Sequence, residues 1–147
     1  MLIKDIIKKN IITGSINSTI YDISKLMTTN NIGFIPIYDS NEIVGVITDR
    51  DIVIRGLSNN EEKISNIMST DIVTIDINLD TDEALDYMSY NKIKRLLVTE
   101  NDDCVGIISL SDIIKHDINN PNIISTIKDI FSENIDNKNV EIDTFEL

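Results

Sequence analysis

The hydrophobic residues in the first part of the chain are spaced in two ways, which predict helices and strands in a definite order. Ile20, Ile23 and Met27 recur at helical spacing and predict an amphipathic helix. Short apolar runs on either side of Ser40 and Asn41 predict two strands joined by a tight turn. The expected elements are a helix at 2–9, a strand at 11–14, a helix at 19–30, strands at 34–39 and 42–48, and a helix at 49–57.

The same pattern returns 61 positions later. Residues 3–55 align with residues 64–116 without a gap, and fourteen aligned pairs are identical. In each copy an apolar strand ends in Thr or Ser, and an Asp follows three positions later. A repeat of about 55 residues buries little surface alone, so we expect the two to pack together about a pseudo-two-fold axis. The expected parts are a first repeat at 1–57, a linker at 58–63, a second repeat at 64–117, and a helix with an acidic tail at 118–147.

The segment after the second repeat contains one further helical pattern. Ile123, Ile124, Ile127, Ile130 and Phe131 predict an amphipathic helix from about 122 to 134. Its apolar stripe requires a partner, which is either the module itself or a second subunit.

Composition restricts the class of protein. With 147 residues, 41% of them hydrophobic, the chain can fill one ordinary core or two small cores that share an interface. Its longest apolar runs are about five residues, whereas a membrane-spanning helix needs ~20. The first residues also lack the regions of a signal peptide, so we expect a cytoplasmic protein that makes no membrane contact. The single cysteine and single histidine exclude an internal disulfide and argue against a zinc site.

The net charge of −12 argues against binding to a nucleic-acid polymer, because such binding depends on Lys and Arg neutralising the phosphates. A small phosphorylated ligand remains compatible with this charge, since a helix N-terminus and one or two local cations can hold it. The junctions Thr48 to Asp51 and Ser109 to Asp112 have the character of such an anion site. They also match ordinary helix-capping boxes, each worth ~1 kcal/mol, and the pattern leaves both interpretations open.

The doubled motif, Gly followed by two apolar residues, Thr or Ser, and then Asp, resembles a tandem pair of cystathionine-beta-synthase (CBS) domains, also called a Bateman module. The likeness covers residues 1 to about 117. Thr48-Asp49-Arg50-Asp51 resembles small bacterial stand-alone CBS-pair proteins, and the run from Lys92 to Asp112 is similar to the gamma subunit of AMP-activated kinase. The resemblance implies an α+β fold in which each repeat is a small sheet packed against two helices. It also implies nucleotide clefts between the repeats and a homodimer.

Carried over by position, the resemblance implies that Asp51 and Asp112 accept hydrogen bonds from ribose hydroxyls. Gly33 and Phe34 occupy the first-repeat positions of Lys94 and Arg95, so the resemblance predicts that the second-repeat site binds phosphate more tightly. The other implied ligand contacts are Thr48, Ser109 and Ser111 near the ribose or phosphate, Lys94 and Arg95 at the phosphates, Ile11, Ile12, Thr13, Ile72, Val73 and Thr74 around the adenine, and Arg50 at the position of Ser111.

Two classes of function follow from these observations. The first is a regulatory sensor that binds AMP, ADP, ATP or a related adenosyl ligand and acts on an unidentified protein partner. The second is a ligand-free structural module that dimerises and acts through protein contacts. An enzyme is not expected, because no nucleophile with a base, no Walker loop and no metal cluster can be assembled from the sequence, and no cofactor is implied.

Overall fold

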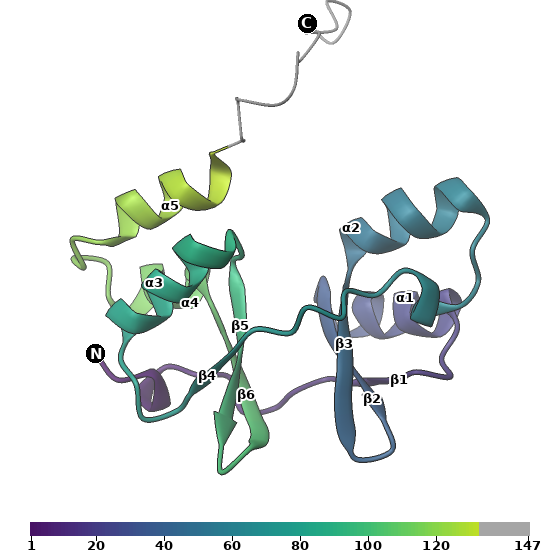
Figure 1. Ribbon diagram of the computed structural model, residues 1–147, viewed down its shortest axis with the longest axis horizontal. Coiled ribbons are helices and arrows are strands. Elements are labelled where there is room, and N and C mark those ends of the chain that lie inside the picture. The colour runs from purple at the N-terminus through teal and green to yellow at the C-terminus, as the bar shows by residue number, and fades with distance from the viewer. Residues whose placement is uncertain (133–147) are drawn as a thin grey trace, which may run out of the picture.

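The computed structural model describes residues 1–132, which form two similar halves side by side (Figure 1). Each half contains a three-stranded sheet in which the first strand is parallel to the second and the second is antiparallel to the third. The strands are β1 (Gly14–Ser15), β2 (Phe34–Asp39) and β3 (Glu42–Thr48) in the first half, and β4 (Thr74–Asp76), β5 (Arg95–Glu100) and β6 (Asp103–Ser109) in the second. The predicted α+β fold with two related repeats is confirmed.

Two helices pack against each sheet. The longer ones, α1 (Ile20–Asn30) and α3 (Thr81–Asn91), both begin with a capping box, at Thr19 and at Asp80. After β3, α2 (Asp49–Asp51) continues through π-helical turns (Ile52–Gly56) and a 3-10 turn (Leu57–Asn59). The second half has α4 (Leu110–His116) after β6, followed by α5 (Ile123–Phe131). None of the helices in residues 1–132 has the length and hydropathy needed to cross a bilayer.

The predicted helix at 2–9 is wrong in its length. Only a 3-10 turn forms, at Ile3–Asp5, and its second-repeat counterpart at Ile64–Asn66 is equally short. The backbone must be extended at Lys8, because its N–H donates to the carbonyl oxygen of Ile107 at 3.3 Å and forms an antiparallel bridge with β6. The strand predicted at 11–14 is also limited to β1, whereas the strands at 34–39 and 42–48 are confirmed.

Each hydrophobic core is completed by the leading segment of the other repeat. Ile3 and Ile6 are buried in the core of the second half, whereas Ile64 and Ile67 are buried in the core of the first. Figure 1 shows the chain starting beside the second half and crossing to β1, and then crossing back before β4. The repeats of the sequence and the packing units of the fold therefore do not coincide.

Glycines allow the backbone to cross at these points. An antiparallel bridge joins Val46 to Ser69, and the equivalent bridge joins Lys8 to Ile107. A Cβ atom on Gly106 would lie 2.9 Å from the carbonyl oxygen of Lys8, too close for a non-bonded contact. The Cβ of an alanine at the equivalent Gly45 would lie 2.8 Å from the carbonyl oxygen of Ser69. Both positions of the repeated motif therefore require a residue without a side chain.

The apolar stripe of α5 packs on the second half of the same chain. Ile123 is buried in the second core, and Ile127 and Ile130 pack against that core. Ile124 and Phe131 remain 69% and 61% exposed. The partner of this helix is therefore the module itself; of the predicted span, residues 133 and 134 lie outside the described part of the chain.

Candidate ligand-binding clefts between the two halves

The two strand-to-helix junctions are both closed by capping boxes. Thr48 Oγ1 accepts a hydrogen bond from the Asp51 N–H at 3.2 Å, and Asp51 Oδ2 accepts one from the Thr48 N–H at 2.9 Å. Ser109 and Asp112 make the same pair of bonds at 3.1 and 2.9 Å. The capping interpretation of these residues is thus confirmed, and each junction is held rigidly at the start of its helix.

The second oxygen of each aspartate faces a cation. Asp51 Oδ1 lies 2.5 Å from a guanidinium nitrogen of Arg55, one helical turn later. Asp112 Oδ1 lies 3.4 Å from the Lys8 ammonium, which comes from the crossing segment. A carboxylate oxygen has two lone pairs, so each can accept a further hydrogen bond while it keeps its cation. The Asp51 side chain is more accessible than that of Asp112, at 15% against 5% exposure.

A cleft of about 490 Å³, here called cleft A, opens beside the first junction. Its walls come from three places: the first-half junction, the segments before β4 and β5 of the second half, and the last turn of α5. The lining residues are Phe34, Val46, Thr48, Arg50, Asp51 and Arg55, then Ser69, Asp71, Ile72, Val73, Lys92, Ile93, Lys94, Arg95 and Leu97, and finally Ile130 and Phe131. The cleft therefore combines an apolar wall with a polar, cationic one.

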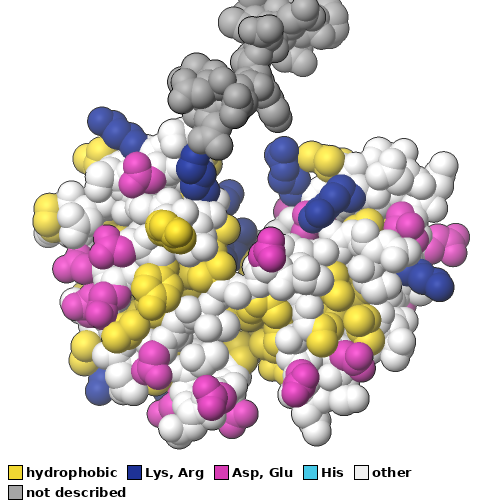
Figure 2. Space-filling view, in the orientation of Figure 1, with side chains coloured by type: hydrophobic (Ala, Val, Ile, Leu, Met, Phe, Trp, Pro, Cys, Tyr) yellow, Lys and Arg dark blue, Asp and Glu magenta, His cyan; other side chains and the backbone are white. Residues whose placement is uncertain are grey.

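Positive charge is concentrated around cleft A, although the whole chain carries −12. Five Lys and Arg side chains line it against the two carboxylates of Asp51 and Asp71. On the face in Figure 2, Lys and Arg side chains gather at the upper middle, on both sides of the boundary between the halves. Two of these cations lie over aromatic rings: Arg95 is 5.6 Å from the ring centre of Phe34, and Lys94 is 5.8 Å from that of Phe131.

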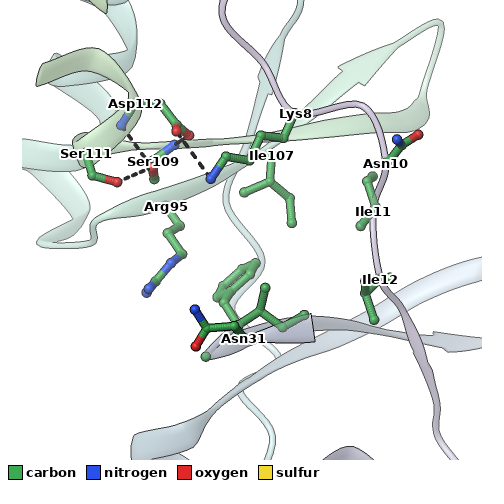
Figure 3. Close-up of a pocket in the computed structure, with 13 residues that line it drawn as sticks. Lys8, Asn10, Ile11, Ile12, Asn31, Arg95, Ile107, Ser109, Ser111 and Asp112 are labelled. Atoms are coloured by element: carbon green, nitrogen blue, oxygen red, sulfur yellow. Dashed lines mark hydrogen bonds and ion pairs between the residues drawn. The ribbon is translucent and has the colours of Figure 1, made fainter. Parts of the chain in front are cut away.

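The second junction borders a smaller cleft of about 240 Å³, here called cleft B (Figure 3). Ser109 Oγ and Ser111 Oγ are 2.8 Å apart on its wall, beside Asp112. The opposite wall comes from the first half. The other lining residues are Lys8, Asn10, Ile11, Ile12, Asn31, Ile32, Gly33, Phe34, Arg95 and Ile107.

Lys94 reaches a cleft that the sequence interpretation did not assign to it. It lines cleft A and does not line cleft B, whereas Arg95 lines both. The backbone before β5 lies beside its own junction, since the Leu110 N–H donates to the Lys94 carbonyl oxygen at 2.8 Å and Arg95 pairs with Ser109. The Lys94 and Arg95 side chains also line cleft A, together with Thr48 and Asp51 of the first half. Lys94 meets Ser109 and Ser111 only in a shallower hollow of about 340 Å³ that shares lining residues with both clefts. Lys94 and Arg95 therefore do not set the second-repeat site apart, because both also line the cleft at the first junction.

The predicted apolar contacts are divided between the two clefts. Ile11 and Ile12 line cleft B, and Ile72 and Val73 line cleft A. Thr13 lines neither cleft, and Thr74 lines a separate outer hollow of about 630 Å³ with Ile72, Tyr38 and Cys104. Burial raises the pKa of both the Cys104 thiol and the Tyr38 phenol in that hollow, so neither group ionises readily.

The sequence interpretation missed several cleft residues. Arg55 follows Asp51 by one helical turn, and this spacing could have revealed it. Lys8, Ile130 and Phe131 could not be found in this way, because they reach the clefts only through the crossing of the chain and the docking of α5.

The fold and its clefts define an α+β module with two hollows between related halves. The family model for the CBS domain matches residues 3–57 and again residues 64–119, and the chain belongs to this family, whose paired domains are regulatory ligand-binding modules.

Three known proteins illustrate the relationship. The CBS domain-containing protein YhcV of Bacillus subtilis is 30% identical over 136 residues, which cover 90% of this chain and 97% of the relative. The CBS domain pair of protein MJ0100, solved in complex with 5′-methylthioadenosine and S-adenosyl-L-methionine, is 32% identical with a TM-score of 0.73; the match covers 78% of this chain and 94% of that one. An inosine-5′-monophosphate dehydrogenase of Methanocaldococcus jannaschii is 30% identical over 76% of this chain, but this is only 22% of the enzyme.

Proposed function

We propose that the protein is a regulatory sensor that binds an adenine nucleotide or a related adenosyl ligand between its two halves, with cleft A as the principal site. The observation that carries this proposal is the make-up of cleft A. An accessible carboxylate beside a hydroxyl, an apolar wall and five cations meet there in one cavity. A ribose, a base and a phosphate chain require these three environments.

Cavity size also favours cleft A. Small-molecule sites typically measure about 300–1,000 Å³. Cleft A, at about 490 Å³, lies within this range, and cleft B, at about 240 Å³, lies below it. Cleft B also has a more deeply buried aspartate and only Lys8 and Arg95 as cations. Cleft B is therefore the weaker or secondary site.

The roles of the cleft residues follow from their positions. Asp51 accepts hydrogen bonds from the ribose hydroxyls, Thr48 lies near the ribose or phosphate, and Ile72 and Val73 contact the base. Arg50, Lys94 and Arg95 contact the phosphates. The complex of the related MJ0100 domain pair with two adenosyl compounds supports an adenosine moiety as the common part of the ligand.

Calorimetric titration tests this function with AMP, ADP, ATP, 5′-methylthioadenosine and S-adenosylmethionine. We expect Asp51→Ala to abolish the tightest binding, while Asp112→Ala leaves it largely intact. The 2′-deoxy analogue of the bound nucleotide should bind ~1–3 kcal/mol more weakly, because one carboxylate lone pair loses its donor. Equal affinity for the two sugars would contradict the role of Asp51. The absence of any binding would leave the alternative, a structural module that acts through protein contacts.

We also propose that the protein is a homodimer, in which the contact is formed by the helical turns that follow α2 in the first half. Val53, Ile54 and Leu57 are exposed there, with Leu57 at 65%. At the position equivalent to Val53 in the second half, Ile114 is partly buried beside Ile127 of α5. A second copy of the chain can cover the first-half surface as α5 covers its counterpart, and a two-fold axis would place the same residues on both sides.

Light scattering tests this assembly. We expect a mass near twice 16.6 kDa for the wild type and a mass near 16.6 kDa for Leu57→Glu, because a carboxylate in the apolar contact opposes association. The exposed Ile124→Glu provides a matched control on α5 that should remain dimeric. A monomeric wild type at micromolar concentration would refute the proposal.

A further inference from the structure

The helix α5 lies outside both segments that match the CBS family model, so the family pattern assigns it no role. Its inner face is anchored on the second half through Ile123, Ile127 and Ile130. In Figure 1 the helix lies above α3 and α4, with its C-terminal end directed toward the middle of the molecule. The position of its last turn is therefore fixed by packing, not by the ligand.

That last turn forms part of cleft A. Ile130 and Phe131 line the cleft, although its junction, Thr48 to Asp51, belongs to the other half. Phe131 is not inserted into a core, since 61% of its surface is exposed. The Lys94 ammonium lies 5.8 Å from the centre of the Phe131 ring, and Lys92 Nζ donates to the carbonyl oxygen of Ser132 at 3.4 Å. Two cations of the cleft are thus held by the end of α5.

We propose that the last turn of α5 completes cleft A and that Phe131 positions Lys94 for a phosphate, so that the cleft selects phosphorylated adenosine ligands over unphosphorylated ones. This inference rests on the proposed function and adds the ligand class. Without the ring, the Lys94 ammonium on its four-carbon stem would sample many positions, and a phosphate would have to order it. The ring holds the charge at the cleft by a cation–π contact that is weaker than a charge-assisted hydrogen bond to phosphate, so Lys94 can transfer to the ligand.

The charge of the cleft indicates the same ligand class. Five cations against two carboxylates favour the negative charges of a di- or triphosphate. 5′-Methylthioadenosine has no charge to match them, and S-adenosylmethionine carries a sulfonium cation that they would repel. The ligands of the related MJ0100 structure are therefore not the ones that this cleft prefers.

Titration of ATP and 5′-methylthioadenosine into four single variants tests the proposal. We expect the wild type to bind ATP at least tenfold more tightly than 5′-methylthioadenosine. Phe131→Ala should weaken ATP binding at least fivefold and change 5′-methylthioadenosine binding less than twofold, and Phe131→Tyr, which keeps a ring, should restore ATP affinity. Lys94→Gln should lose the preference for ATP. Ile124→Ala is the matched control, because it lies on the same helix with similar exposure and lines neither cleft.

A double variant separates positioning from a general loss of structure. If Phe131 acts through Lys94, adding Phe131→Ala to Lys94→Gln should cause no further loss of ATP affinity. Unchanged ATP affinity in Phe131→Ala, an equal loss for both ligands, or a wild type that prefers 5′-methylthioadenosine would each overturn this inference and leave the sensor function in place. A wild type that binds none of the adenosine compounds would overturn both.

Discussion

Replacing Gly106 by alanine tests whether the two halves depend on the close crossing of the backbone. The new Cβ atom would lie 2.9 Å from the Lys8 carbonyl oxygen and 3.0 Å from the Ile7 side chain. Relief of this contact moves the crossing segment away from β6. Two hydrogen bonds between Lys8 and Ile107, at 3.3 and 3.2 Å, would then lengthen or break.

The expected loss of stability follows from these contacts. Two backbone hydrogen bonds contribute ~0.5–1.5 kcal/mol each, and overpacking typically costs ~1–3 kcal/mol. Because relaxation relieves part of the clash at the expense of the bonds, the two terms do not add fully, and we expect a loss of ~2–4 kcal/mol. Domains of this kind are stabilised by only ~5–15 kcal/mol, so the effect is large. The shift of Lys8 should also disturb its contact with Asp112 in cleft B.

Urea unfolding followed by circular dichroism measures this loss. With a slope of ~2 kcal/mol per molar urea, the midpoint should fall by ~1–2 M. Gly33→Ala is the matched control, because its Cβ meets only the end of the exposed Asp49 side chain, which can rotate away. That variant should stay within ~1 kcal/mol of wild type. A change of less than ~0.5 kcal/mol in Gly106→Ala, as at an ordinary surface site, would refute the importance of the crossing.

Two further predictions concern charged side chains. Hydrogen bonds from Asn120 and Thr81 lower the pKa of Asp117 below its ordinary 3.8, so its carboxylate stabilises the fold above that pH and this contribution is lost as pH falls through the lowered value. In acid unfolding, the stability advantage of wild type over Asp117→Asn should therefore shrink as pH falls below the ordinary pKa of 3.8, and a constant difference would contradict the assignment. Lys92 ends α3 in the left-handed region at φ 54°, as Asn31 ends α1 at φ 52°. Because Asn tolerates this conformation, the free energy of unfolding of Lys92→Asn should lie within ~1 kcal/mol of the wild-type value. The variant should bind ATP more weakly, and unchanged ATP affinity would exclude Lys92 from the phosphate site.

Local chemistry explains what the sequence could predict. The strands at 34–39 and 42–48 were located correctly because their apolar runs and the Ser40-Asn41 turn lie within one short segment. The capping boxes were equally predictable, since their partners are three residues apart.

Contacts between distant segments explain what the sequence could not predict. The helix expected at 2–9 is cut short by Ile107, and only the folded chain brings that residue to Lys8. The position of Lys94 at cleft A was missed for a related reason. An internal repeat shows that two junctions exist, but it does not show which loop of one repeat faces the junction of the other.

The exchange of leading segments between the two cores also sets an order for folding during synthesis. The first core can close once Ile64 and Ile67 have left the ribosome. The second core needs Ile3 and Ile6 together with Ile113, which is made more than a hundred residues after them. At ~5–20 residues per second, the leading isoleucines wait without their partners for roughly 5–20 seconds. During that interval they can take the place of a neighbouring chain's own leading segment as its second half closes, so crowded polysomes should favour exchanged dimers of this protein over dilute refolding from denaturant.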